Sequence, residues 1–79
     1  MATAITHVDA ARIHVNPKKL RKLSQTKIRQ YAHDYDKGDS FPPIVVEDCG
    51  EFYTVRDGRH RLQAQLSIGI QSIDVSLYN

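Results

Sequence analysis

The stretch YTVRDGRHRLQAQ, Tyr53–Gln65, passes from an extended run into a helical one. Its first three residues are aromatic or β-branched, which favours a strand. Asp57 and Gly58 then supply turn chemistry, and the run after them favours a helix. Four basic or titratable side chains crowd this turn: Arg56, Arg59, His60 and Arg61. Because like charges so close repel, the stretch predicts a bound anion.

The turn has the features of a phosphate site. Free backbone N–H groups and the helix dipole favour an anion at a helix N-terminus. Gly58 lets the main chain approach a ligand or take a positive φ. Arg59 and Arg61 can bind phosphate oxygens in a bidentate way, and His60 can donate to an anion or act as acid or base. The alternative is structural: Asp57 caps the helix and the arginines face solvent. The strand–turn–helix setting favours phosphate binding.

The other elements follow from apolar periodicity and turn signals. The first helix of the chain is predicted from an N-cap at Ser24 to about Lys37, with Gly38 at its C-terminal end and one apolar face made by Ile28, Tyr31, Ala32 and Tyr35. In the helix after Gly58, Leu62 and Leu66 are expected to pack and Gly69 to end it.

Strands are predicted at Ala11–Val15, before the Asn16-Pro17 turn, and at Ile44–Glu47, which pairs with Phe52–Val55 as a hairpin. A last strand buries Ile73, Val75 and Leu77 on one side. The order β-α-β-β-α-β predicts an α+β domain with a mixed sheet.

Length and composition predict one small domain over residues 1–79. The single cysteine, Cys49, cannot form an internal disulfide, which favours a reducing compartment. The start MATAITHVDA does not have the pattern of a signal peptide, and no apolar run approaches the roughly 20 residues of a membrane span. A cytoplasmic protein without a membrane partner is therefore expected.

Charge is unevenly distributed along the chain. The formal net charge is +2, made up of about +6 over residues 1–30, about −5 over residues 31–54 and about +1 thereafter. A basic segment beside an acidic one favours a local anion site over binding of nucleic acid by the whole surface. PKKLRK can equally be a solvated charge run. No metal site is predicted, because the histidines lack metal-ligand spacing with Cys49.

From about Ile13 to Leu77 the sequence resembles the ParB/sulfiredoxin-like domain superfamily. The resemblance rests on VNPKKLR, on DSFPPIVV after the first helix, and on YTVRDGRHRLQA. It implies a small ParB/sulfiredoxin-like β-α-β-β-α-β domain of the stand-alone ParB N-terminal type. It further implies a nucleoside triphosphate ligand, ATP or CTP, with Mg²⁺.

The resemblance also assigns residues. Gly58, His60 and Arg61 match the Gly-x-His-Arg phosphate-binding pattern of sulfiredoxin, and Lys27 matches a lysine that sulfiredoxin directs at the nucleotide. Arg59 stands where sulfiredoxin has its catalytic cysteine, so sulfinic-acid repair is not expected. GRHR also departs from the Gly-Glu-Arg-Arg usual in ParB. Similarity to the kinase-like branches makes Asp57 the candidate catalytic base.

Three functions compete. The leading hypothesis is a small nucleotide-binding protein with NTPase or phosphotransfer activity, its phosphates held at Asp57–Arg61 and the helix N-terminus. The second is a DNA-binding protein or nuclease that uses the same basic site and the basic residues Lys18, Lys19, Arg21 and Lys22. The third is a non-enzymatic inhibitor or adaptor of a mobile element, which would act on a protein partner.

Overall fold

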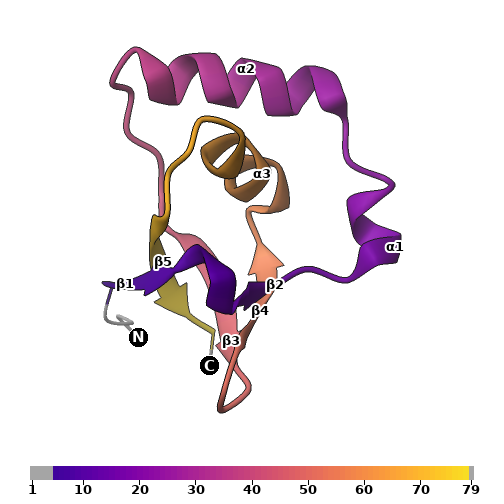
Figure 1. Cartoon of the computed structure of the whole chain (residues 1–79), viewed down its shortest axis with the longest axis vertical. Coiled ribbons are helices and arrows are strands. Elements are labelled where there is room, and N and C mark those ends of the chain that lie inside the picture. Colours follow the sequence, from indigo (N-terminus) through magenta and orange to yellow (C-terminus); the bar gives the residue numbers. More distant parts are fainter. Residues whose placement is uncertain (1–4, 79) are drawn as a thin grey trace.

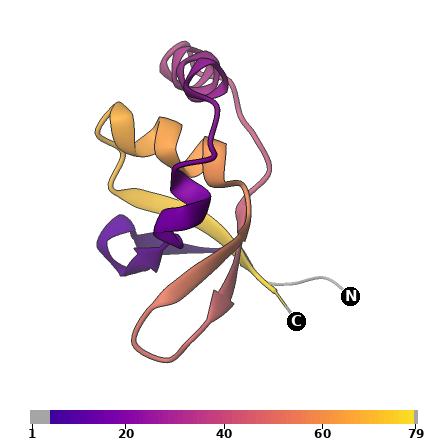
Figure 2. The ribbon, with the colours of Figure 1, turned by 90° about the vertical axis from the view of Figure 1, so that its right-hand side faces the viewer.

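The computed structural model describes residues 5–78 as three layers, namely a curled mixed sheet, helix α3 on it and helix α2 outside α3 (Figure 1). Figure 2 shows the layers from the side, with α2 nearly end-on above α3. The elements in chain order are β1 (Ile5–Asp9), the 3-10 helix η1 (Ala10–Arg12), β2 (Ile13–His14), α1 (Pro17–Leu20), α2 (Gln25–Asp36), β3 (Ile44–Asp48), β4 (Tyr53–Asp57), α3 (Arg59–Ser67) and β5 (Ser72–Leu77). The predicted α+β class with a mixed sheet is confirmed. Across residues 5–78, no helix is long and apolar enough to cross a membrane.

The five strands lie in the order β1-β5-β3-β4-β2. β3 and β4 pair antiparallel as the predicted hairpin, with a register shift between Val45 and Val46. β3 pairs parallel with β5, and β2 pairs parallel with β4. β1 completes the sheet antiparallel to β5. The sheet thus joins both ends of the described chain, and the carboxyl end of β4 leads directly into α3.

The core lies between the sheet and α3. Ile44 and Val75 pair across β3 and β5, and Val46 pairs with Val55 on β4. Leu62 of α3 is 1% exposed and packs on them, a burial that contributes about 1.5–3 kcal/mol. Alternation along β3 and β5 places these side chains on one face, as expected for strands with one covered side.

The N-terminal third differs from the sequence expectation. The predicted strand Ala11–Val15 is only two residues long as β2, because η1 occupies the residues before it. Asn16-Pro17, expected to be a turn, instead begins α1: the Asn16 side chain accepts from the Lys18 N–H at 2.9 Å, and Pro17 takes the first helical position. Strand β1 was not predicted.

Helix α2 follows its prediction closely. The Ser24 side chain accepts from the Lys27 N–H at 3.2 Å, and Gly38 follows the helix with φ +98°. The predicted packing of Leu66 in α3 is wrong, since that residue is 40% exposed. Because α3 is covered by the sheet on one side and by α2 on the other, Gln65 is buried instead and donates through Nε2 to the Tyr35 hydroxyl at 3.2 Å.

Candidate functional site

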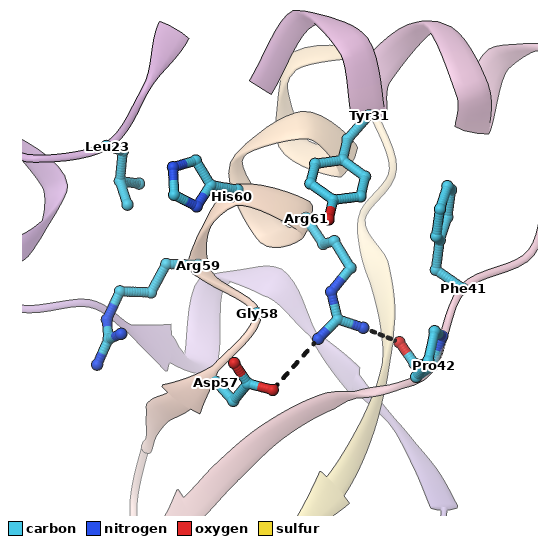
Figure 3. Close-up of a pocket in the computed structure, with 9 residues that line it drawn as sticks. All are labelled: Leu23, Tyr31, Phe41, Pro42, Asp57, Gly58, Arg59, His60 and Arg61. Carbon is cyan, nitrogen blue, oxygen red and sulfur yellow. Dashed lines mark hydrogen bonds and ion pairs between the residues drawn. The ribbon is translucent and has the colours of Figure 1, made fainter. Parts of the chain in front are cut away.

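A pocket of about 390 Å³ opens where β4 ends and α3 begins (Figure 3). The turn forms one wall, and the opposite wall comes from the segment before α2, from α2 itself and from the segment before β3. The lining residues are Leu23, Tyr31, Phe41, Pro42, Asp57, Gly58, Arg59, His60 and Arg61. The structure therefore brings all five residues of the predicted Asp57–Arg61 turn to one pocket. Their role in binding stays a prediction.

Gly58 shapes the turn. Its φ is +101°, in the left-handed region that favours glycine. A Cβ at this position would lie 2.9 Å from Arg61 Nη2 and 2.9 Å from Ile44 Cδ1. Gly58 also occupies the N-cap of α3, without a side-chain cap. The prediction that Asp57 caps this helix is wrong, because Asp57 is still the last residue of β4.

Arg61 holds the two walls of the pocket together. Nη1 donates to the Pro42 carbonyl oxygen, and Nη2 lies 3.6 Å from an Asp57 carboxylate oxygen. The Arg61 side chain is only 12% exposed, whereas that of Asp57 is 78% exposed. The alternative in which this arginine simply faces solvent is therefore wrong for Arg61, which has a structural role in joining α3 to the segment before β3.

His60 links the first turn of α3 to the start of α2. Its Nε2 accepts from the Ser24 backbone N–H at 3.0 Å. A ring nitrogen that accepts carries no proton, so the neutral imidazole has its proton on Nδ1. His60 therefore has one N–H left to donate to a ligand.

The two remaining arginines have different surroundings. Arg56 does not line the pocket: Nη1 lies 3.2 Å from Glu47 Oε1, and the guanidinium lies 4.3 Å from the centroid of the Tyr78 ring. Arg59 lines the pocket, and its buried Nε has no hydrogen-bond partner among residues 5–78. Figure 3 shows the Arg59 side chain extending to the side of Gly58 opposite Arg61.

The apolar wall was missed in the sequence analysis. Tyr31 and Phe41 meet edge to face with ring centroids 5.3 Å apart, and the rings of Tyr35 and Phe41 lie 4.8 Å apart. The sequence pattern places Tyr31 only on the apolar face of its helix. The aromatic residue in FPP, a few residues after the predicted helix end, is the one sequence signal for this wall. Tyr31 and Phe41 give the pocket an apolar aromatic wall opposite its basic turn.

Lys27 and the basic residues of the α1 region lie elsewhere. Lys27 is exposed in the first turn of α2 and does not line the pocket. The same holds for Lys18, Lys19, Arg21 and Lys22. The pocket lining therefore contains the turn but none of these five basic residues, and their roles in binding stay predictions. Cys49 is exposed in the β3–β4 hairpin turn, outside the pocket. No group of three or more His, Cys, Asp or Glu in the described part of the chain could hold a metal ion.

Comparisons with solved structures agree on the fold. Sulfiredoxin from Arabidopsis thaliana is similar with a TM-score of 0.82 at 20% identity, over 96% of this chain and 85% of that one. Chromosome-partitioning ParB from Caulobacter crescentus, complexed with CTP-gamma-S, has a TM-score of 0.79 at 15% identity, over 96% of this chain and 44% of that one. A free serine kinase in complex with AMP has a TM-score of 0.78 at 13% identity, over 100% of this chain and 32% of that one.

These identities show a shared fold. The chain spans less than half of the ParB and kinase chains. No curated protein sequence matches it significantly. The model of the ParB N-terminal domain family, however, matches residues 1–79. The chain belongs to the ParB N-terminal domain family.

Proposed function

We propose that this protein binds a nucleotide in the pocket between the Asp57–Arg61 turn and the aromatic wall. The observation that carries the proposal is that one pocket of about 390 Å³ combines an open helix N-terminus with an apolar aromatic wall. That volume is in the range of small-molecule sites, which combine apolar walls with a few placed polar groups.

The start of α3 would hold the phosphates. The first intrahelical bond runs from the Leu62 N–H to the Gly58 carbonyl oxygen at 2.9 Å, so the preceding amides of the first turn have no acceptor within the helix. No side chain caps them. Gly58 lacks a side chain that would block the approach of an anion. Free amides and the helix dipole make this end of α3 a natural phosphate site.

The aromatic wall would hold the nucleoside. Tyr31 and Phe41, with Leu23 and Pro42, offer the apolar surface on which a base or ribose can pack. Solved relatives carry both pyrimidine and purine nucleotides, namely CTP-gamma-S in ParB and AMP or ADP in the free serine kinase. On this basis ATP and CTP are the proposed ligands.

For catalysis we propose NTPase or phosphotransfer activity with Asp57 as the base. Asp57 is the one carboxylate among the described residues that line the pocket, and Arg61 holds it at the edge. It is exposed enough to take a proton from an incoming water or hydroxyl group. Mg²⁺ would neutralise phosphate charge, with Asp57 as the nearest carboxylate and phosphate and water oxygens as its other ligands.

A thermal-shift screen with ATP, ADP, CTP and GTP, each with and without Mg²⁺, tests the proposal. A ligand at 100 times its Kd stabilises the folded protein by about 2.7 kcal/mol, which a melting curve of a domain this small resolves easily. Asp57→Asn should keep the shift measured without Mg²⁺ and lose turnover. Absence of any shift with all four nucleotides would overturn the proposed function.

DNA binding is the second candidate. Its basis is the exposure of the basic residues Lys18, Lys19, Arg21 and Lys22 around α1, apart from the pocket. A separate surface predicts that DNA and mononucleotide bind independently, which a competition titration measures.

A further inference from the structure

We infer that Arg59 selects ligands with two or more linked phosphate groups over ligands with one. The inference rests on the proposed function, because it assigns a specificity-determining role within the same pocket.

Arg59 is the lining cation without a partner in the described part of the chain. A guanidinium carries five N–H donors. In Arg61, Nη1 is used by Pro42 and Nη2 by Asp57. For Arg59, no carboxylate of residues 5–78 lies within 4.0 Å, and the buried Nε donates to none of these residues.

Burial makes this lack of a partner informative. Buried polar groups in folded proteins nearly always have a hydrogen-bond partner, and a charged donor without one is costly. The Nε atom itself is closed to solvent, but the Arg59 side chain lines the pocket, so a ligand there can accept from the other N–H groups of the guanidinium. The non-bridging oxygens of a phosphate group share its negative charge and are among the strong acceptors that a guanidinium can bind in a bidentate way.

The position of Arg59 explains why this acceptor would be a second phosphate. The backbone of Arg59 begins α3, next to Gly58, where the free amides would take the first phosphate. Its side chain leaves in the direction away from Arg61 (Figure 3). A single phosphate on the amides therefore leaves the guanidinium unpaired, whereas a linked second phosphate extends along the turn and supplies the missing acceptor.

The test compares mono- and diphosphates of two nucleosides. Dissociation constants of AMP, ADP, CMP and CDP are measured by calorimetry at one fixed salt concentration, for the wild type and for Arg59→Gln and Arg59→Lys. Arg29→Gln is the matched control, because Arg29 is an exposed arginine of α2 outside the pocket. A charge-assisted contact corresponds to at least about tenfold tighter binding of the diphosphate.

We expect Arg59→Gln to remove most of that preference while monophosphate affinity changes by less than about twofold. Arg59→Lys, which keeps the charge and loses the buried Nε donor, should lower the preference partly. Arg29→Gln should leave it unchanged. Circular dichroism checks the fold of each variant, and Arg59→Lys alone decides the matter if the glutamine variant does not fold.

The possible results test the role of Arg59 separately from the proposed nucleotide binding. A wild-type protein that binds nucleotide, with a diphosphate preference unaltered by either Arg59 substitution, overturns the role of Arg59 and leaves the proposed function intact. Equal weakening of mono- and diphosphates in both variants also overturns the selective role. A wild-type protein that binds none of the four ligands overturns the proposed function and this inference together.

Discussion

Replacing Gly58 by alanine tests whether the turn is shaped as the structure has it. Two costs add at this position. An L-residue with φ near +101° pays about 1–2 kcal/mol for the left-handed backbone. The new Cβ would lie 2.9 Å from Ile44 Cδ1 and 2.9 Å from Arg61 Nη2. Ile44 is fully buried and Arg61 is hydrogen-bonded to Pro42, so neither moves freely. Overpacking of this kind costs about 1–3 kcal/mol.

The expected loss of stability for Gly58→Ala is therefore about 2–5 kcal/mol. For a domain of this size each 1 kcal/mol lowers Tm by about 4–8 °C, so a loss of about 2–5 kcal/mol should lower Tm by about 8–40 °C. Urea denaturation monitored by circular dichroism gives the free energy of unfolding directly.

Gly38→Ala is the matched control. Gly38 has φ +98°, but nothing lies within 4 Å of the Cβ that alanine would add. It should therefore cost only the backbone part, about 1–2 kcal/mol. If the two substitutions are equally destabilising, the close approach of Gly58 to Ile44 and Arg61 is wrong. The described packing of the Asp57–Arg61 turn would then also be wrong.

Three further predictions concern other parts of the protein. Arg61→Ala should lower the free energy of unfolding by about 1–3 kcal/mol, because the contacts of Arg61 with Pro42 and Asp57 are lost. It should also weaken nucleotide binding. An unchanged urea denaturation curve would contradict the structural role of Arg61. Burial raises the pKa of Tyr35 above 10.0, so its stabilising effect is complete below about pH 10 and is lost as the pH rises through the folded-state pKa. Unfolding free energies measured from about pH 9 to about pH 11 should accordingly fall less steeply in Tyr35→Phe than in the wild type. If the α1 region binds DNA, the logarithm of the DNA affinity should fall linearly with the logarithm of the salt concentration. Joint alanine substitution of Lys18, Lys19 and Lys22 should make that slope less steep and leave mononucleotide binding unchanged.

Helix α2 and the β3–β4 hairpin could be predicted because each carries clear local sequence signals. Helix α2 has a cap at Ser24, an apolar face and a terminal glycine, and the β3–β4 hairpin has two β-branched runs around a short turn. Strand β1 has no such pattern, and its pairing with β5 joins residues at opposite ends of the chain. Which face of α3 is buried also depended on α2, a partner that periodicity within α3 does not reveal.

The candidate site also has one part that the sequence predicts and one part that it does not. Strand, turn and helix start were predictable from adjacent residues. The opposite wall comes from Leu23, Tyr31 and the Phe41-Pro42 segment, which only the tertiary fold brings to the turn. Sequence also could not distinguish the arginines, because what separates Arg56 from Arg61 is the presence of Glu47 beside one and Pro42 beside the other.

These surroundings change the electrostatics expected of the turn. Arg56 is turned away, and Arg61 is paired with Asp57. His60 Nε2 accepts from the Ser24 N–H, which leaves Nδ1 as the ring nitrogen that can face a ligand. Under the proposed function, the attraction for an anion would come from the free amides of α3 and from Arg59. Such a site would recognise the geometry of a phosphate chain more than negative charge as such, because most of its donors are fixed backbone groups.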